Sequence, residues 1–201
     1  MNLDLDILYW INGHHTAWLD SLMWTVSRAA TWIPLYVLLV GLVIYRFRNW
    51  KQILMIFLAF GIAVGLSDYT CSGILKPLVC RLRPTHEPAI DPLHLVRGYT
   101  GGLYGFCSSH AANTMSVALL FCLLFKNKTA TIGLMTWVAA NSYSRVYLGA
   151  HYPSDILVGW LIGAWWSCLA FAALQRWVLP AEVPPSGSLR EDDEAPQQGG
   201  S

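Results

Sequence analysis

Residues 53–75 read ILMIFLAFGIAVGLSDYTCSGIL, an apolar run in which Asp68 is the one charged side chain. A helix needs about 20 such residues to cross a hydrocarbon core of about 30 Å. A helix also satisfies its own backbone hydrogen bonds at that depth, whereas an unpaired strand does not. The run therefore predicts a transmembrane helix. Within it, Asp68 is expected to face a protein neighbour, with Tyr69 or Ser72 as its partner.

Four further runs resemble the first in length and composition. Together the five runs predict an all-α fold, a polytopic membrane helical bundle with about five transmembrane helices. The segment before them, residues 3–12, mixes apolar side chains with Asp4 and Asp6 and is too short to cross. We expect it to form an N-terminal interfacial helix. The four further runs are Thr25–Tyr45, His110–Phe125, Thr129–Tyr147 and Ser154–Trp177.

The composition agrees with a bilayer environment. Of the 201 residues, 55% are hydrophobic and 12% are charged, and the mean hydropathy is +0.42. These values are too apolar for a soluble domain of this size. The 10 Trp and 9 Tyr residues suit the two membrane interfaces, where amphipathic rings are enriched.

Charge divides the chain into two parts. Residues 180–201 hold one basic residue and five acidic ones, so the remainder has twelve Lys and Arg against seven Asp and Glu. The tail is also rich in Pro, Gly and Gln, which is typical of disordered chain. The sequence therefore predicts a membrane-embedded domain over residues 1–179 and a disordered cytoplasmic tail over residues 180–201.

Basic residues in the short connections between the apolar runs predict the orientation of the chain in the membrane. Arg46 and Lys51 lie between the first two runs, and Lys126 lies between the third and fourth. The positive-inside rule makes this face cytoplasmic. Residues 76–109 and 144–154 then share the outer face, where further cations have no role in topology and indicate a site that needs positive charge.

Three polar segments lie on that outer face: KPLVCRLRP at residues 76–84, CSSHAANT at residues 107–114 and SRVYLGAHYPSD at residues 144–155. The first carries cations ahead of a proline that stops a helix. The second places His110 in the first turn of a helix, where free backbone amides bind anions. The third ends in a histidine and an acid at the start of another helix.

His151 and Asp155 lie four residues apart in the third segment. At this spacing a carboxylate accepts a hydrogen bond from one imidazole nitrogen and leaves the other nitrogen with a free lone pair. A histidine held in this way is a nucleophile. Cations from the three segments would neutralise the oxygens of a phosphoryl group, and His110 would protonate the departing oxygen.

The three segments closely resemble the signature of the type 2 phosphatidic acid phosphatase family. That signature has a Lys and an Arg-Pro separated by six residues, then Pro-Ser-Gly-His, then Ser-Arg, five residues, His, three residues and Asp. The resemblance implies that His151 becomes a phosphohistidine, that Asp155 orients it and that His110 is the acid. It implies phosphate binding by Lys76, Arg83, Ser108, Ser109 and Arg145.

Two departures from the signature lie in the second segment. The family's Pro is Cys107 here and its Gly is Ser109, so that backbone approach to the phosphate is less free. Serine still donates and caps a helix, and we expect activity to survive. A disulfide between Cys80 and Cys107 requires both loops to face an oxidising compartment, and it is not part of the prediction.

The resemblance implies an integral membrane lipid phosphatase that needs no metal and no cofactor. It places the protein in the inner (plasma) membrane of a bacterium, with the active site on the outer, periplasmic face. Lipid A phosphate or undecaprenyl diphosphate is the expected substrate, and phosphatidylglycerophosphate and phosphatidic acid are alternatives. The membrane and its lipid phosphate are the predicted partners; no nucleic acid and no particular oligomeric state is indicated.

Two other functions use the same residues. A membrane protein that binds an anionic headgroup without cleaving it would need the cations, but it leaves the spacing of His151 and Asp155 unexplained. Vanadium-dependent haloperoxidases share these phosphate-binding motifs because vanadate mimics phosphate. They are soluble enzymes, and the five apolar runs argue against that class.

Other outer residues have less specific interpretations. Two histidines and two acids lie within residues 86–94, but the interspersed Pro88 and Pro92 favour an irregular loop over a metal site. Arg81 and Arg97 lie off the motif. For these two cations both a contact with lipid headgroups and a role in the site stay open.

Overall fold

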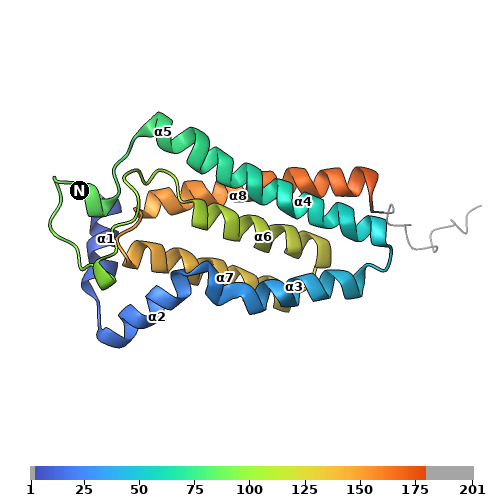
Figure 1. Cartoon of the computed structure of the whole chain (residues 1–201), viewed down its shortest axis with the longest axis horizontal. Helices are drawn as coiled ribbons and strands as arrows, with labels where there is room; N and C mark the ends of the chain where they lie inside the picture. Colours follow the sequence, from blue (N-terminus) through green and yellow to red (C-terminus); the bar gives the residue numbers. More distant parts are fainter. Residues whose placement is uncertain (1–2, 180–201) are drawn as a thin grey trace, which may run out of the picture.

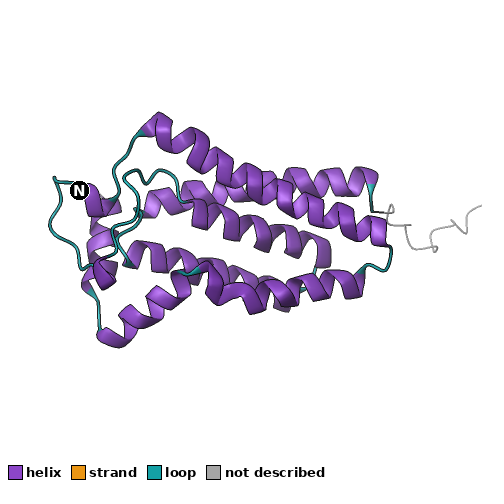
Figure 2. Cartoon of the chain, viewed as in Figure 1, coloured by secondary structure: helices purple, strands orange, loops and turns teal. Residues whose placement is uncertain are grey.

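The structure, a computed structural model, describes residues 3–179. Figure 1 shows the long helices side by side, with α1 lying across one end of the bundle. Figure 2 shows helices and loops; among the described residues, the one strand-like pairing is an isolated bridge between Leu82 and Tyr104. The all-α prediction is confirmed. The principal helices are α1 (Leu3–Gly13), α2 (Ala17–Ser27), α3 (Ile33–Arg46), α4 (Trp50–Asp68), α6 (Ser109–Phe125), α7 (Lys128–Tyr147) and α8 (Pro153–Trp177).

Three helical segments within residues 3–179 are long and apolar enough to cross a bilayer: Ala29–Arg46, Trp50–Val79 and Pro153–Trp177. The apolar α6 is shorter, with 17 residues. The 20-residue α7 buries polar side chains such as Asn141 and Ser144, which lower its hydropathy. Length and composition thus support three of the predicted spans directly. The count of five stays a prediction, and the predicted tail at 180–201 lies outside the described residues.

The N-terminal part differs from the prediction of one unbroken helix over Thr25–Tyr45. The structure ends α2 at Ser27 and places Arg28 in an extended conformation, with φ −85° and ψ 126°. A short 3-10 helix, η1 (Ala29–Trp32), then leads into α3. Apolar residues continue through the break, so hydropathy alone does not reveal it, and the prediction is wrong at this point.

The first helix, α1, is fastened to the ends of α7 and α8. Its Leu8 and Ile11 are buried in a cluster with Tyr147 and Ile156. The side chain of Asn12 donates to the backbone oxygen of Tyr147 at 2.8 Å. A helix therefore forms where the interfacial segment was expected, and its packing holds the acidic residues of its first turn near the loops at this end of the bundle.

The helices α6 and α8 approach each other closely through glycines. A Cβ on Gly163 would lie 2.3 Å from the backbone oxygen of Ala112, and one on Gly159 would lie 2.6 Å from that of Ser108. Small residues of this kind let helix backbones meet in a membrane, where packing and polar contacts drive association. The backbone N–H of Ser108 donates to the backbone oxygen of Asp155 at 3.0 Å. This packing joins the start of α6 to the start of α8.

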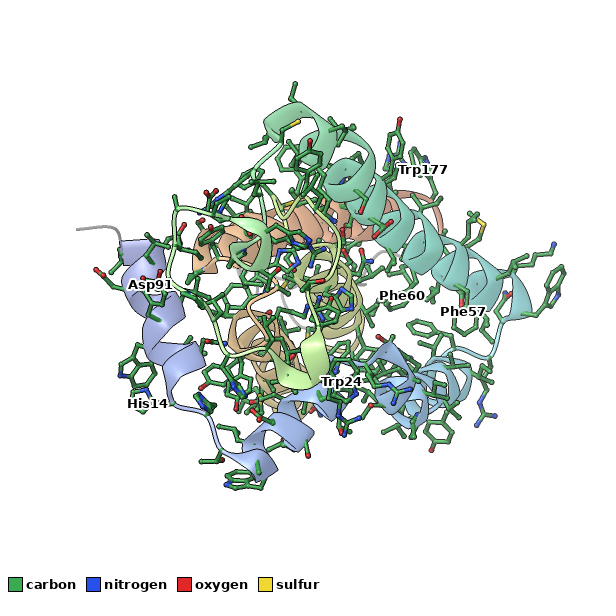
Figure 3. All side chains as sticks on the ribbon, turned by 60° about the vertical axis from the view of Figure 1, so that its left-hand side comes forward. His14, Trp24, Phe57, Phe60, Asp91 and Trp177 are labelled. Carbon is green, nitrogen blue, oxygen red and sulfur yellow. The ribbon has the colours of Figure 1, made fainter. Side chains whose placement is uncertain are left out.

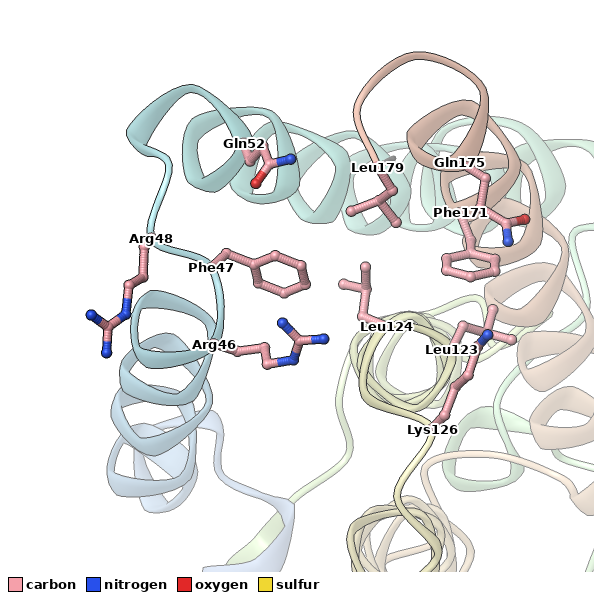
Figure 4. A pocket seen from close by; sticks show the side chains of 10 residues that line it. All are labelled: Arg46, Phe47, Arg48, Gln52, Leu123, Leu124, Lys126, Phe171, Gln175 and Leu179. Carbon is pink, nitrogen blue, oxygen red and sulfur yellow. The ribbon is translucent and has the colours of Figure 1, made fainter. Parts of the chain in front are cut away.

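The basic connections gather at the opposite end of the bundle. A cavity of about 430 Å³ lies there, between the α3–α4 connection and the ends of α6 and α8 (Figure 4). Arg46, Arg48 and Lys126 line it, together with apolar side chains such as Phe47 and Leu124. The cations of two predicted cytoplasmic connections therefore share one end of the molecule, remote from the loop that carries the first two polar segments.

Candidate active site

His151 lies in the turn between α7 and α8, directly before the helix that carries Asp155. Both side chains are buried, with exposed fractions of 1% and 0%. His151 Nδ1 faces Asp155 Oδ2 at 3.4 Å. The backbone N–H of Tyr152 donates to the same carboxylate oxygen at 3.0 Å. The predicted spacing of four residues thus brings the carboxylate behind the imidazole, with the first turn of α8 holding it in place.

The imidazole of His151 is neutral at neutral pH. Burial, followed by the positive charges of Arg83 and Arg145, holds the pKa of His151 well below its usual value. A carboxylate accepts hydrogen bonds and cannot donate one, so its position favours the proton on Nδ1. The lone pair of Nε2 is then available as a nucleophile.

Lys76 follows a local change in helix geometry. After α4 the chain continues through a π-helical stretch, η2 (Tyr69–Leu75), into the short α5 (Lys76–Val79). Such stretches re-aim the side chains around them and are frequent at functional sites. The ammonium group of Lys76 donates to Ser109 Oγ at 2.9 Å and to Ser72 Oγ at 3.2 Å. The first and second polar segments therefore meet at this lysine.

Arg83 and Arg145 bring two further cations from separate segments. Arg83 Nη1 donates to the backbone oxygen of Ala150 at 3.3 Å. Arg145 Nη2 donates to the hydroxyl of Tyr99 at 2.8 Å, and Arg145 Nη1 donates to Ser27 Oγ. Within residues 3–179 neither guanidinium pairs with a carboxylate. Their charge is therefore available to an anion.

The start of α6 supplies His110 and the two serines. Ser108 is the N-cap, and its hydroxyl accepts from the backbone N–H of Ala111 at 3.4 Å. His110 lies in the first turn, where free amides and the helix dipole favour negative charge. Ser109 contacts the Lys76 ammonium, as described above. The second segment therefore forms a helix start of the predicted kind despite the serine in place of the family's glycine.

These side chains meet at one cavity of about 580 Å³. Figure 3 brings this end of the molecule forward, with Asp91 labelled beside α1. Two of the predicted site residues, Ser108 and Asp155, lie behind the cavity wall and act on their neighbours. The predicted site residues that line the cavity are Lys76, Arg83, Ser109, His110, Arg145 and His151.

Two charged residues of this region were not predicted as site residues. Arg81 donates to Asp155 Oδ1 at 3.0 Å and to Asp4 of α1 at 2.8 Å. Its guanidinium also lies over the ring of Tyr152, 3.8 Å from the centroid. Arg81 therefore joins the carboxylate behind His151 to the first turn of α1. The sequence places Arg81 two residues before Arg83, which indicates that it lies near the site. This spacing alone does not show which of the two arginines lines the cavity.

One smaller expectation is corrected. Asp68 has Asn113 as its partner, since Asn113 Nδ2 donates to Asp68 Oδ1 at 3.2 Å, and neither Tyr69 nor Ser72 takes this role. Cys107 is buried, and its sulfur contacts the sulfur of Cys71. Cys80 is exposed and does not contact Cys107. The considered bridge between Cys80 and Cys107 is thus not formed.

The described histidine and acid contacts of the 86–94 loop are with different partners. His94 pairs with Asp20 of α2 at 2.9 Å and stacks on His15, 3.8 Å between centroids. The backbone N–H of Asp91 donates to the hydroxyl of Tyr9 at 2.8 Å. These contacts fasten the loop to α1 and α2. Across the described range 3–179, no group of three His, Cys, Asp or Glu is arranged to hold a metal ion.

Comparison with known proteins identifies the family of this chain. The sequence profile of the PAP2 superfamily matches residues 50–179. A lipid A 4'-phosphatase of Bacteroides thetaiotaomicron is 35% identical over 164 residues, which is 81% of this chain and 72% of that protein. An undecaprenyl-diphosphatase of Sulfolobus acidocaldarius is 30% identical over 173 residues, which is 85% of this chain and 78% of that protein.

Two solved structures share the fold. The crystal structure of Aquifex aeolicus LpxE matches with a TM-score of 0.65 at 21% sequence identity, covering 86% of this chain and 96% of that one. A PAP2 type phosphatidylglycerolphosphate phosphatase from Bacillus subtilis matches with a TM-score of 0.64 at 22% identity, covering 87% and 85%. At these identities the likeness shows the helical membrane fold and nothing finer.

Proposed function

This chain belongs to the PAP2 superfamily, and on that basis we propose that it hydrolyses a phosphate ester or diphosphate of a membrane lipid through a phosphohistidine at His151. It is a metal-independent phosphatase of the membrane. The observation that carries the proposal is one cavity lined by two histidines and three cations, with a carboxylate directly behind His151.

In the first step Nε2 of His151 attacks the phosphorus atom, and the bond from phosphorus to the leaving oxygen breaks. Burial and the charges of Arg145, Arg83 and Lys76 lower the pKa of His110 to about 4 in the empty site, and the negative oxygens of the bound phosphate offset those cations. His110 then takes up a proton with the substrate and donates it to the leaving oxygen as that oxygen departs. Lys76, Arg83 and Arg145 neutralise the equatorial oxygens, whose negative charge must be stabilised throughout. Asp155 stabilises the positive charge that develops on the His151 ring.

In the second step a water molecule enters where the leaving group departed. His110, now without its proton, takes one from the water, which attacks phosphorus and breaks the bond to Nε2. Inorganic phosphate leaves, and both histidines return to their starting protonation states. The same residue thus acts first as acid and then as base, as microscopic reversibility requires.

We place the site on the outer, periplasmic face of a bacterial inner membrane, with residues 1–179 as the catalytic membrane domain. The basic end lined by Arg46, Arg48 and Lys126 supports this orientation, since such residues favour the cytoplasmic side. The names of the relatives support lipid A phosphate or undecaprenyl diphosphate as substrate.

The direct test is phosphate release from phosphorylated lipids by the purified protein in detergent, with a chelator present. We expect turnover of at least one lipid and its loss in His151→Ala. A protein that merely binds the headgroup would release no phosphate. Vanadate should inhibit because it fills the phosphoryl site, and full insensitivity to vanadate would contradict the mechanism.

A further inference from the structure

Two buried cysteines meet between the first and second polar segments, and the two catalytic steps do not use them. Cys71 lies in the π-helical stretch η2, five residues before Lys76, and Cys107 lies directly before the N-cap Ser108. Both cysteines have an exposed fraction of 0%. Their sulfur atoms lie 2.8 Å apart, although 36 positions separate the two residues in the sequence. The contact therefore joins the segment that carries Lys76 to the segment that carries His110.

Both cysteines are free thiols in the structure, and their contact is close in geometry to a disulfide. The sulfur atoms of a disulfide are about 2.05 Å apart, so less than about 1 Å separates this contact from a covalent bond. The pair lies in an apolar cluster with Ala112, against which partly buried side chains such as Phe106 and Val158 pack. A bond formed there is shielded, because a reductant reaches the sulfurs only through local opening of the fold.

The other three cysteines lie apart from this pair. Cys80 and Cys168 are exposed, and Cys122 is buried in a separate apolar cluster. The family signature has a proline where Cys107 stands in this chain, and a proline forms no such bond. Membership of the family therefore does not account for the pair.

The same two segments also meet through polar side chains next to the cysteines. Ser72 follows Cys71, and Ser72 Oγ lies 2.7 Å from Ser109 Oγ. The ammonium group of Lys76 donates to both hydroxyls, at 3.2 Å and 2.9 Å. Each such hydrogen bond contributes little net stability where water competes for it. A covalent bond beside these contacts would hold η2 in register with the start of α6 and keep Lys76 in place.

We propose that Cys71 and Cys107 form a structural disulfide, and that this bond fixes Lys76 against the start of α6. The proposed periplasmic face agrees with this bond, since disulfides form and persist in the bacterial periplasm. In the reaction two S–H bonds break and one S–S bond forms. Two electrons and two protons pass to a disulfide oxidant such as oxidised glutathione, which becomes two thiols. The consequence for Lys76 rests on the proposed phosphatase function, whereas the bond itself does not.

The first test counts reactive thiols in the purified full-length protein in detergent. The protein is equilibrated in a buffer of reduced and oxidised glutathione with the reduced form in excess. It is then unfolded in the presence of N-ethylmaleimide, and its mass is measured. We expect three of the five thiols to react, and all five after full reduction with dithiothreitol. Five reactive thiols before reduction would refute the disulfide.

Two variants assign the bond to its cysteines. Cys71→Ala should show four reactive thiols before and after reduction, because Cys107 then has no partner. Cys80→Ser is the matched control, since Cys80 is an exposed cysteine in the segment that carries Lys76. This variant should keep the bond and show two reactive thiols before reduction. Retention of a bond in Cys71→Ala together with its loss in Cys80→Ser would refute the proposed pairing.

The consequence for Lys76 is measured on oxidised and fully reduced wild type, so that no variant needs to fold. Reduction should lower the midpoint of thermal unfolding by at least about 4 °C, since the bond closes a loop of about 36 residues. It should also weaken inhibition of lipid hydrolysis by inorganic phosphate about threefold, because the cation that binds a phosphate oxygen is no longer held in advance. Cys80→Ser should respond to reduction as wild type does.

The outcomes separate the bond from the function. An equal unfolding midpoint or equal phosphate inhibition in the two forms would refute the stabilising role of the bond at Lys76. A protein that contains the bond but releases phosphate from no lipid would refute the phosphatase and leave the disulfide standing.

Discussion

Arg81 Nη1 lies 3.0 Å from Asp155 Oδ1, while the other oxygen of the same carboxylate faces His151 Nδ1 at 3.4 Å. Arg81 does not line the cavity. It is held in turn by Asp4 of α1, at 2.8 Å, and by its position over the Tyr152 ring. The carboxylate behind the proposed nucleophile is therefore held by a cation that lies outside the cavity. Arg81 is a positioning residue, and α1 contributes to the site through Asp4.

Arg81→Ala should lower kcat about tenfold and change KM by less than about twofold, because the orientation of His151 is loosened while the phosphate-binding cations remain. Arg81→Lys should recover part of the loss. Steady-state kinetics on the lipid substrate measures both values. Arg97→Ala is the control, since Arg97 is an exposed cation that lies over Trp24 and should leave kcat unchanged. A rise in KM alone would assign Arg81 to substrate binding instead.

His110→Ala should slow lipid hydrolysis about 100-fold or more, because an alkoxide leaving group needs a proton. An activated aryl ester such as p-nitrophenyl phosphate leaves as a stable phenolate and needs none. With this ester the variant should release about one equivalent of phenolate rapidly and then turn over slowly, since the second step still lacks its base. Rapid-mixing absorbance measures the burst. Slowing of both substrates by the same factor without a burst would remove His110 as the acid.

The buried His151 predicts a loss of stability in acid. Its pKa in the folded protein lies well below the 6.5 expected in the unfolded chain. Below pH 6.5 and above the folded pKa, the unfolded chain binds a proton that the folded protein does not. Stability therefore falls as pH falls through this window, by up to about 1.4 kcal/mol per pH unit.

Unfolding in detergent at pH 7, 6 and 5 measures this dependence. His151→Gln lacks the titrating group and should show a correspondingly smaller loss over the same window. His94→Gln serves as the control, because it leaves the contribution of His151 in place. Identical pH dependence in wild type and His151→Gln would show that His151 is not held neutral by the fold.

The sequence predicts which candidate site residues lie close together where a short spacing determines the geometry. His151 and Asp155 are four residues apart, which is about one helical turn. Residues 76 and 83 flank one helix end. Local structure therefore brings the two members of each pair close to each other. The long apolar runs likewise predict α4 and α8, because helix is the stable open-ended element in a bilayer. These inferences need no knowledge of tertiary packing.

Other features depend on packing between segments remote in sequence. Arg81 and Arg83 look alike in the sequence, and the structure separates them only because Asp4 meets Arg81 across 77 positions. The partner of Asp68 is Asn113 of another helix, whereas local reasoning proposed neighbours in its own. The break at Arg28 interrupts an apolar stretch, and no hydropathy pattern marks it. Contacts between residues of different helices depend on how the helices pack, and the sequence of one segment does not reveal them.

The contact of Gly163 with Ala112 gives a prediction about what holds the site together. A Cβ at Gly163 would lie 2.3 Å from a backbone oxygen, which cannot rotate away as a side chain would, so α6 and α8 would have to separate. Gly163→Ala should therefore cost at least about 2 kcal/mol of stability. It should also lower activity, because the Ser108 to Asp155 backbone contact lies in the same interface.

Gly133→Ala on α7 is the matched control: its Cβ would meet nothing within 4 Å, and the higher helix propensity of alanine should maintain or raise stability. Thermal unfolding of the two variants in one detergent compares them directly. If both melt at the same temperature, close packing of α6 on α8 does not govern the stability of this fold.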